Sequence, residues 1–184
     1  MEPLLTVGHG PLDAEALLSL LHGADVGALV DVRRFPASRR NPTVAREHLA
    51  AALPAASVAY RWEERLGGRR RLPADEPGAD SWWTVDAFRA YAAHTRTQEF
   101  AEAMGELLAQ AAETRTTVMC SESVWWRCHR RLIADVVTVG HGHDVLHLMP
   151  DGKLRPHRPA EGARRRQDGL VVWDADLAGE TGRG

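Results

Sequence analysis

The chain has 184 residues, 44% of them hydrophobic and 26% charged, which is the size and composition of one globular domain. No apolar run approaches the roughly 20 residues that a membrane-spanning helix needs, so the sequence excludes an integral membrane protein. The two cysteines exclude a disulfide scaffold. Together with an N-terminus that lacks a basic region and a long apolar stretch, they predict a cytoplasmic location. A formal net charge of -2 argues against a protein whose main task is to coat nucleic acid.

Residues 4 to 32 predict a strand, a helix and a second strand. The apolar run at 4–7 stops at a Gly-His-Gly-Pro turn, Asp13 can cap the helix that follows, and Gly23 ends that helix. A second apolar run at 26–32 has the length and composition of a buried strand. Because a helix connects the two strands, we expect them to be parallel.

The remaining chain continues this alternation. We expect a helix at about 43–53, a strand at 57–62, helices at 84–95 and 97–114, a strand at 116–120, a helix at 128–137 and a strand at 144–148. Residues 63–80 form the longest irregular segment. The sequence therefore predicts one α/β domain over residues 1–150, with a largely parallel sheet of about five strands and helices on both faces. A C-terminal tail over 151–184 is expected to be partly disordered or loosely docked.

Chemically versatile side chains follow several of the predicted strands. In open α/β sheets, ligands bind beyond the carboxyl ends of the parallel strands. The residues found there are His9 after the first strand, Asp31 and Arg33 after the second, Cys120 and Glu122 after the fourth, and Cys128, His129 and Arg130 at the start of the next helix. This convergence predicts a site at one edge of the sheet.

Cys120 is the candidate nucleophile or redox-active thiol of that site. A thiol at a strand end that faces a helix N-terminus and nearby arginines should have a lowered pKa and more thiolate. His9 and Glu122 are the acid–base candidates, whereas Arg33, Arg39 and Arg130 would hold an anionic substrate. The alternative for Cys120 is a plain core residue at the end of a buried strand.

Two other interpretations compete with the enzyme. The first is a non-catalytic module that binds a nucleotide or a nucleic acid, because arginines suit phosphates and tryptophans suit bases. The arginines are at 33, 34, 39, 40, 65, 69, 70 and 71, and the five tryptophans are at 62, 82, 83, 125 and 126. The second is a zinc site on Cys120, Cys128 and His129 with His9 as fourth ligand, although the adjacent ligands at 128 and 129 are awkward to direct at one ion. Otherwise we expect no cofactor, and no membrane partner.

Four motifs together resemble the bacterial and archaeal family catalogued as domain of unknown function 488. They are Thr6-Val7-Gly8-His9; Asp31-Val32-Arg33 with Pro36 and Ser38-Arg39; Leu66-Gly67-Gly68; and Cys120-x-Glu122 followed by Cys128-His129-Arg130. The resemblance covers about residues 4–149. It implies a compact α/β domain without a transferable activity, and it places the family's motif residues on His9, Asp31, Arg33, Ser38, Arg39, Cys120, Glu122, Cys128, His129 and Arg130. Gly10 departs from the serine usual in the family, so a substrate contact of that hydroxyl would be altered or absent here.

From the residues and the resemblance together we expect an enzyme that acts on an anionic substrate, nucleotide-like or phosphorylated. Cys120, His9 and Glu122 are its expected catalytic residues. Its expected substrate-binding residues are Asp31, Arg33, Ser38, Arg39, Cys128, His129 and Arg130.

Overall fold

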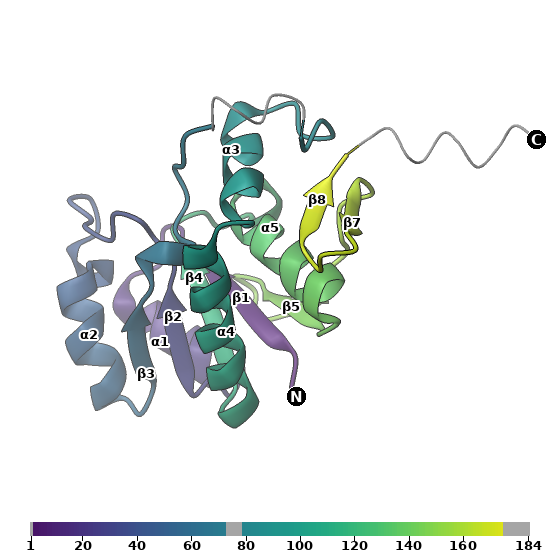
Figure 1. Ribbon diagram of the computed structural model, residues 1–184. Coiled ribbons are helices and arrows are strands. Elements are labelled where there is room, and N and C mark those ends of the chain that lie inside the picture. The colour runs from purple at the N-terminus through teal and green to yellow at the C-terminus, as the bar shows by residue number, and fades with distance from the viewer. Residues whose placement is uncertain (1, 73–78, 175–184) are drawn as a thin grey trace, which may run out of the picture.

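The computed structural model describes residues 2–72 and 79–174, which fold around a six-stranded sheet (Figure 1). The strand order is β3-β2-β4-β1-β5-β6. The strands are β1 (Leu4–Gly8), β2 (Ala28–Asp31), β3 (Ala59–Trp62), β4 (Thr116–Cys120), β5 (Val145–Leu148) and β6 (Leu154–Pro156). The first five are parallel to their neighbours, and β6 runs antiparallel to β5. The predicted single α/β domain with a largely parallel sheet is thereby confirmed.

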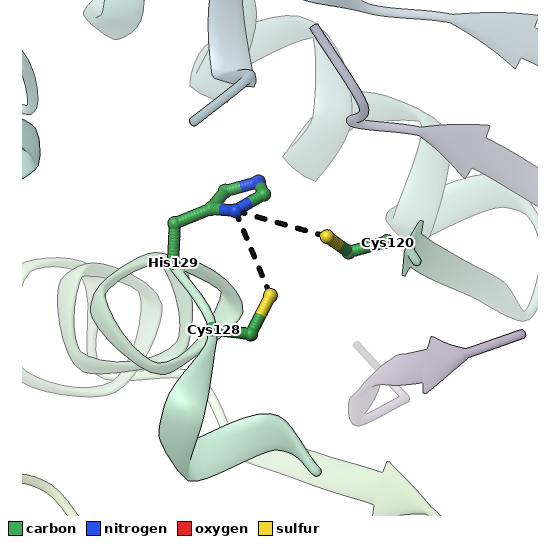
Figure 2. Close-up of side chains that lie close together, drawn as sticks. All are labelled: Cys120, Cys128 and His129. Carbon is green, nitrogen blue, oxygen red and sulfur yellow. Dashed lines mark hydrogen bonds between the residues drawn. The ribbon is translucent and has the colours of Figure 1, made fainter. Parts of the chain in front are cut away.

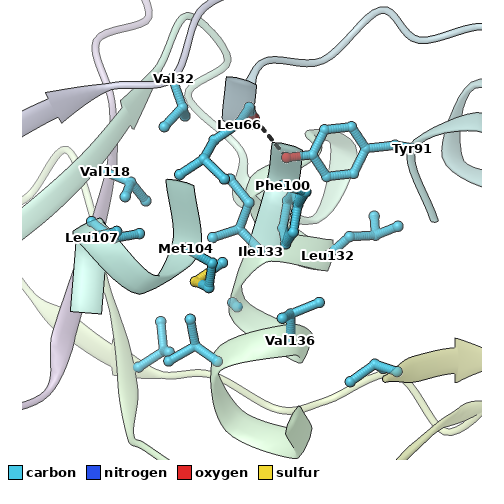
Figure 3. Packing of buried hydrophobic residues seen from close by; sticks show 14 of the residues in the cluster. Val32, Leu66, Tyr91, Phe100, Met104, Leu107, Val118, Leu132, Ile133 and Val136 are labelled. Atoms are coloured by element: carbon cyan, nitrogen blue, oxygen red, sulfur yellow. Dashed lines mark hydrogen bonds between the residues drawn. The ribbon is translucent and has the colours of Figure 1, made fainter. Parts of the chain in front are cut away.

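Helices cover both faces of this sheet. They are α1 (Ala14–Gly23), α2 (Arg46–Ala55), α3 (Asp86–His94), α4 (Gln98–Glu113) and α5 (Arg130–Asp135). Leu5 and Val7 of β1 pack with the buried residues of α1 and α2, whereas Leu4 packs in the cluster of α3, α4 and α5. Figure 3 shows part of this second cluster. Successive side chains of a strand point to opposite faces, so each apolar strand supplies both cores. No helix in the described ranges is long and apolar enough to cross a membrane.

The sheet has six strands where the sequence predicts about five. The additional strand, β6, comes from the segment expected to be a tail, and it pairs Leu154 with Leu148 and Pro156 with Leu146. Three residues that include an arginine and a proline carry no strand pattern of their own. Pairing with the exposed edge of β5 is what makes them a strand.

The rest of the C-terminal segment, as far as residue 174, is packed against the domain. Strands β7 (Ala163–Arg165) and β8 (Val171–Trp173) form a hairpin. Its last residue, Trp173, is fully buried, and its indole N–H donates a 2.7 Å hydrogen bond to Asp135 of α5. Burial of this large ring fixes the hairpin to the core. Residues 175–184 lie outside the described residues.

A buried chain of hydrogen bonds ties the same segment to the sheet. The Thr6 hydroxyl lies 2.7 Å from Nδ1 of His147. Nε2 of His147 lies 3.0 Å from Nδ1 of His157. Nε2 of His157 lies 2.8 Å from the Asp135 carboxylate. Trp125 stacks on the His147 ring at 3.9 Å between centroids. Since Trp125 belongs to the loop between β4 and α5, this network also supports the loop that carries the candidate site.

Candidate functional site

A cavity of about 420 Å³ opens where the carboxyl ends of β1, β2 and β4 meet. Seven of the residues predicted for the site line it: His9, Arg33, Ser38, Cys120, Glu122, Cys128 and His129. They come from the turns after three parallel strands and from the start of α5. The position agrees with the rule that ligands of open α/β sheets bind beyond the strand ends.

Two thiols and an imidazole meet at the inner wall of this cavity (Figure 2). Nδ1 of His129 lies 3.8 Å from Sγ of Cys120 and 3.6 Å from Sγ of Cys128. Both cysteines are free and buried, with 6% and 4% of their surface exposed. Cys120 ends β4, and Cys128 immediately precedes His129 at the start of α5, so the β4–α5 loop folds back to bring its two ends together.

The His129 ring is fixed from several sides. Its Nε2 lies 3.2 Å from the carbonyl oxygen of Val32. A carbonyl only accepts, so Nε2 carries the proton of the neutral ring and Nδ1 presents its lone pair to the thiols. The Tyr91 ring lies 5.0 Å away between centroids, and Gly68 approaches so closely that a Cβ there would lie 2.9 Å from Nδ1.

The two thiols differ in acidity. A hydrogen bond from the Cys128 thiol holds the pKa of Cys120 well below its ordinary value, and His129 adds to this effect while burial opposes it. The same hydrogen bond and burial raise the pKa of Cys128 well above its ordinary value. Cys120 is therefore the more acidic of the two thiols.

Arg33 is held beside the cavity by a buried ion pair. Asp31 accepts from Nε and Nη2 of Arg33 at 2.8 and 2.5 Å, and it also accepts from the Tyr60 hydroxyl at 2.8 Å. The third guanidinium nitrogen, Nη1, lies 3.4 Å from Nε2 of His9. Nδ1 of His9 lies 3.0 Å from the Gly10 carbonyl. Burial, followed by the charge of Arg33, lowers the pKa of His9 and so favours its neutral ring.

The β4–α5 loop is anchored through its backbone. The buried Arg130 donates to the carbonyl oxygen of Glu122. A Cβ on Gly8 would lie 1.8 Å from that same oxygen, so only glycine allows β1 to approach the loop this closely. The Glu122 side chain is exposed at the cavity wall. Arg130 thus supports the loop from beneath and does not itself line the cavity.

Cations and aromatic rings surround the cavity mouth. Arg34, Arg69 and Arg127 line it, and within residues 2–72 and 79–174 none of the three forms an ion pair with a carboxylate. Phe35 is 64% exposed, and the Arg34 and Arg69 guanidiniums lie 5.9 and 5.8 Å from its ring centre. Positive charge beside an exposed aromatic face suits an anion that carries a ring.

The cavity differs from the predicted set in three ways. Asp31, Arg39 and Arg130 do not line it, and neither do the five tryptophans proposed for an aromatic surface. The aromatic lining residues are instead Phe35, Phe88 and Tyr91. Tyr91 and Phe88 lie on α3, where the helical spacing of apolar residues identifies them as core and gives no signal of a cavity.

Comparison with known proteins identifies a family. The model of the family described as domain of unknown function DUF488 matches residues 13–137. This range contains Arg33, Cys120, Cys128 and His129, and it covers more than half of the chain. Neither a curated protein nor a solved structure matches. The chain belongs to the DUF488 family.

Proposed function

We propose that this protein is an enzyme in which the Cys120 thiolate attacks an anionic substrate bound in the cavity. The observation that carries the proposal is the Cys120–His129 pair, with 3.8 Å between Sγ and Nδ1, in a cavity whose mouth is lined by three guanidiniums without carboxylate partners among the described residues. A thiol beside an imidazole that is oriented by a third group is the arrangement of an activated sulfur nucleophile. Here the third group is the Val32 carbonyl.

The chemistry follows from these contacts. Nδ1 of His129 takes the thiol proton of Cys120, and the thiolate forms a bond to an electrophilic atom of the substrate. The leaving group departs with its bonding pair and receives the proton from His129. Water, activated in turn by His129, then cleaves the bond to sulfur and releases the product. In this role His129 replaces His9 and Glu122, since His9 is engaged with Gly10 and Arg33.

The substrate we propose is a phosphorylated or nucleotide-like molecule. Guanidiniums suit phosphate oxygens because their donors form a planar fork. Arg34 and Arg69 line the cavity beside the Phe35 ring, and Arg127 lines it too, so a phosphate and an aromatic base can bind together. Nucleotides and short single strands share this chemistry.

The test is the rate at which each cysteine is alkylated by iodoacetamide as a function of pH, read by peptide mass spectrometry on chelator-treated protein. We expect Cys120 to react with an apparent pKa below the ~8.5 of a free thiol, and Cys128 to react slowly. In His129→Asn the Cys120 profile should shift toward that of a free thiol. A Cys120 that stays inert until denaturant is added would refute the nucleophile and favour the non-catalytic binding module.

Substrate class is tested by protection of Cys120 from the same reagent. Nucleotides and inorganic phosphate should slow alkylation, and less so as salt rises. Arg127→Ala should weaken protection by about 10-fold, the order of one charge-assisted hydrogen bond. Arg40→Ala is the matched control, because Arg40 is exposed and does not line the cavity. Equal loss in both variants would mean that only general surface charge is involved.

A further inference from the structure

Three atoms that bind metal ions well lie at the corners of a small triangle in the cavity wall. Sγ of Cys120, Sγ of Cys128 and Nδ1 of His129 are all within 4.8 Å of one another. The two sulfur–nitrogen distances are 3.8 and 3.6 Å. With zinc–sulfur bonds of about 2.3 Å and a zinc–nitrogen bond of about 2.0 Å, a tetrahedral site places sulfur and nitrogen about 3.5 Å apart. The metal-free side chains therefore stand close to the spacing that zinc requires.

The backbone explains how two adjacent residues point at one spot. Cys128 is extended, with φ -130° and ψ 152°, whereas His129 is helical, with φ -57° and ψ -17°. The change of conformation between them turns the Cys128 side chain back toward Nδ1 of its neighbour, as Figure 2 shows. The objection that adjacent ligands diverge holds for a regular strand, where successive side chains alternate. It does not hold at this junction.

The surroundings match those of a metal-bound histidine. Such a ring usually donates its second N–H to a backbone carbonyl or a carboxylate, which fixes the coordinating nitrogen. Nε2 of His129 makes this contact with Val32, and the close backbone of Gly68 limits rotation of the ring. The coordinating atom, Nδ1, is thereby directed at both sulfurs.

All three residues line the cavity, so the fourth position of a tetrahedral site is open to a ligand from the cavity. Sites with three protein ligands and one open position are typical of catalytic or exchangeable zinc, whereas structural sites are closed by four. His9 also lines the cavity, but its two ring nitrogens contact the Gly10 carbonyl and Arg33. The guanidiniums at the mouth favour an anion in the open position, and two thiolates balance the charge of the ion.

We propose that Cys120, Cys128 and His129 bind Zn²⁺ as a three-ligand site whose open position faces the cavity. Binding displaces the two thiol protons into solvent and leaves His129 bound through its neutral Nδ1. The consequence for activity rests on the proposed function: Cys120 cannot serve as nucleophile while its sulfur is bound to the ion. Zinc occupancy and thiol chemistry then exclude each other at the same site.

The experiment uses the full chain, reduced and treated with chelator, titrated with Co²⁺ under anaerobic conditions. We expect thiolate-to-cobalt charge-transfer absorption in the near ultraviolet and the visible bands of tetrahedral cobalt, both removed by Zn²⁺. Cys128→Ser and His129→Asn should each lower the affinity for Co²⁺ by about 100-fold or more. Loss of a group that only hydrogen-bonds a metal ligand costs about 10- to 100-fold in affinity, and loss of a ligand itself should cost more. His9→Asn should bind like the wild type.

Absence of thiolate bands, or unchanged affinity in Cys128→Ser, would overturn the metal site. Equal loss in His9→Asn would overturn the three-ligand assignment. Circular dichroism of each variant separates loss of binding from loss of folding. The two proposals fail separately. If Cys120 is alkylated at low pH but no cobalt bands appear, the nucleophile stands and the metal site is refuted. If cobalt bands appear but Cys120 is inert in the metal-free protein, the metal site stands and the nucleophile is refuted.

Discussion

At the scale of single residues, the His129 ring is positioned by a glycine as much as by its hydrogen bond. Gly68 leaves room for the ring, and a Cβ at this position would lie 2.9 Å from Nδ1 and 3.2 Å from Cγ. These separations are shorter than normal van der Waals contact, so the ring of a Gly68→Ala variant must move. The Leu66-Gly67-Gly68 motif thus contributes to the site through the absence of a side chain.

We expect Gly68→Ala to move Nδ1 away from the two thiols and to raise the pKa of Cys120. At pH values below the pKa of Cys120, a rise of one unit would slow its alkylation roughly tenfold, because the thiolate fraction falls by that factor there. The control is Gly105→Ala on α4, where a Cβ meets no atom within 4 Å. That change should leave alkylation unaltered and stabilise the fold by up to about 1 kcal/mol. Equal alkylation rates in the two variants would contradict this role of Gly68.

Residue spacing predicts the edge of the sheet at which the candidate cavity opens, but not which residues pair there. Strand ends identify Cys120, Arg33 and His9 because the carboxyl ends of parallel strands share one edge. Which imidazole faces the thiol depends on the backbone at 128 and 129 and on the Val32 carbonyl. Residue spacing shows neither this backbone conformation nor the position of the carbonyl. The sequence therefore predicts His129 as a substrate-binding residue and not as the partner of the nucleophile.

At the scale of secondary-structure elements, the five parallel strands could be predicted and the C-terminal strands could not. Strands β1, β2 and β4 are fully buried and mostly apolar, and β3 alternates apolar and polar residues, so each carries a strand pattern in its own sequence. Strands β6, β7 and β8 have three residues each and depend on partners distant in sequence. Tertiary pairing decides the structure of such segments, and local propensity does not.

The β7–β8 hairpin should contribute measurably to stability through Trp173. We expect Trp173→Ala to lower the free energy of unfolding by about 3–5 kcal/mol, because it empties a fully buried site. Trp173→Phe keeps most of the apolar volume but removes the N–H that donates to Asp135, so the free energy of unfolding should fall by about 1–3 kcal/mol. Trp126→Ala, at a ring 45% exposed, should cost about 0.5 kcal/mol or less. Urea denaturation measures all three, and similar losses at 173 and 126 would contradict a docked hairpin.

At the scale of the whole molecule, the buried histidines make stability depend on pH. Burial, together with the neighbouring His157 and Arg130, lowers the pKa of His147 to about 3. In the unfolded chain a histidine titrates near 6.5, so between these values the unfolded state binds a proton that the folded state does not. Stability is complete above about pH 6.5 and falls as the pH decreases toward 3.

We expect the free energy of unfolding to fall by up to about 1.4 kcal/mol per pH unit for this one group between pH 6 and 4. His9 and His94, whose pKa values burial also lowers, add to the slope. Urea denaturation at a series of pH values measures it. His147→Gln should flatten the dependence, and His48→Gln, at an exposed position, should leave it unchanged. An unaltered slope in His147→Gln would exclude this histidine as a source of acid sensitivity.

Strand β6 also determines what lies at one border of the sheet. Parallel β5 would otherwise end the sheet with a row of unpaired N–H and C=O groups, to which a strand of another molecule can add. β6 covers that row, and its own outer side is short, with Arg155 and Pro156 both exposed. Proline has no N–H to offer, and a charged neighbour repels further copies. Strand β6 thereby closes this border of the sheet against the addition of a strand from another molecule.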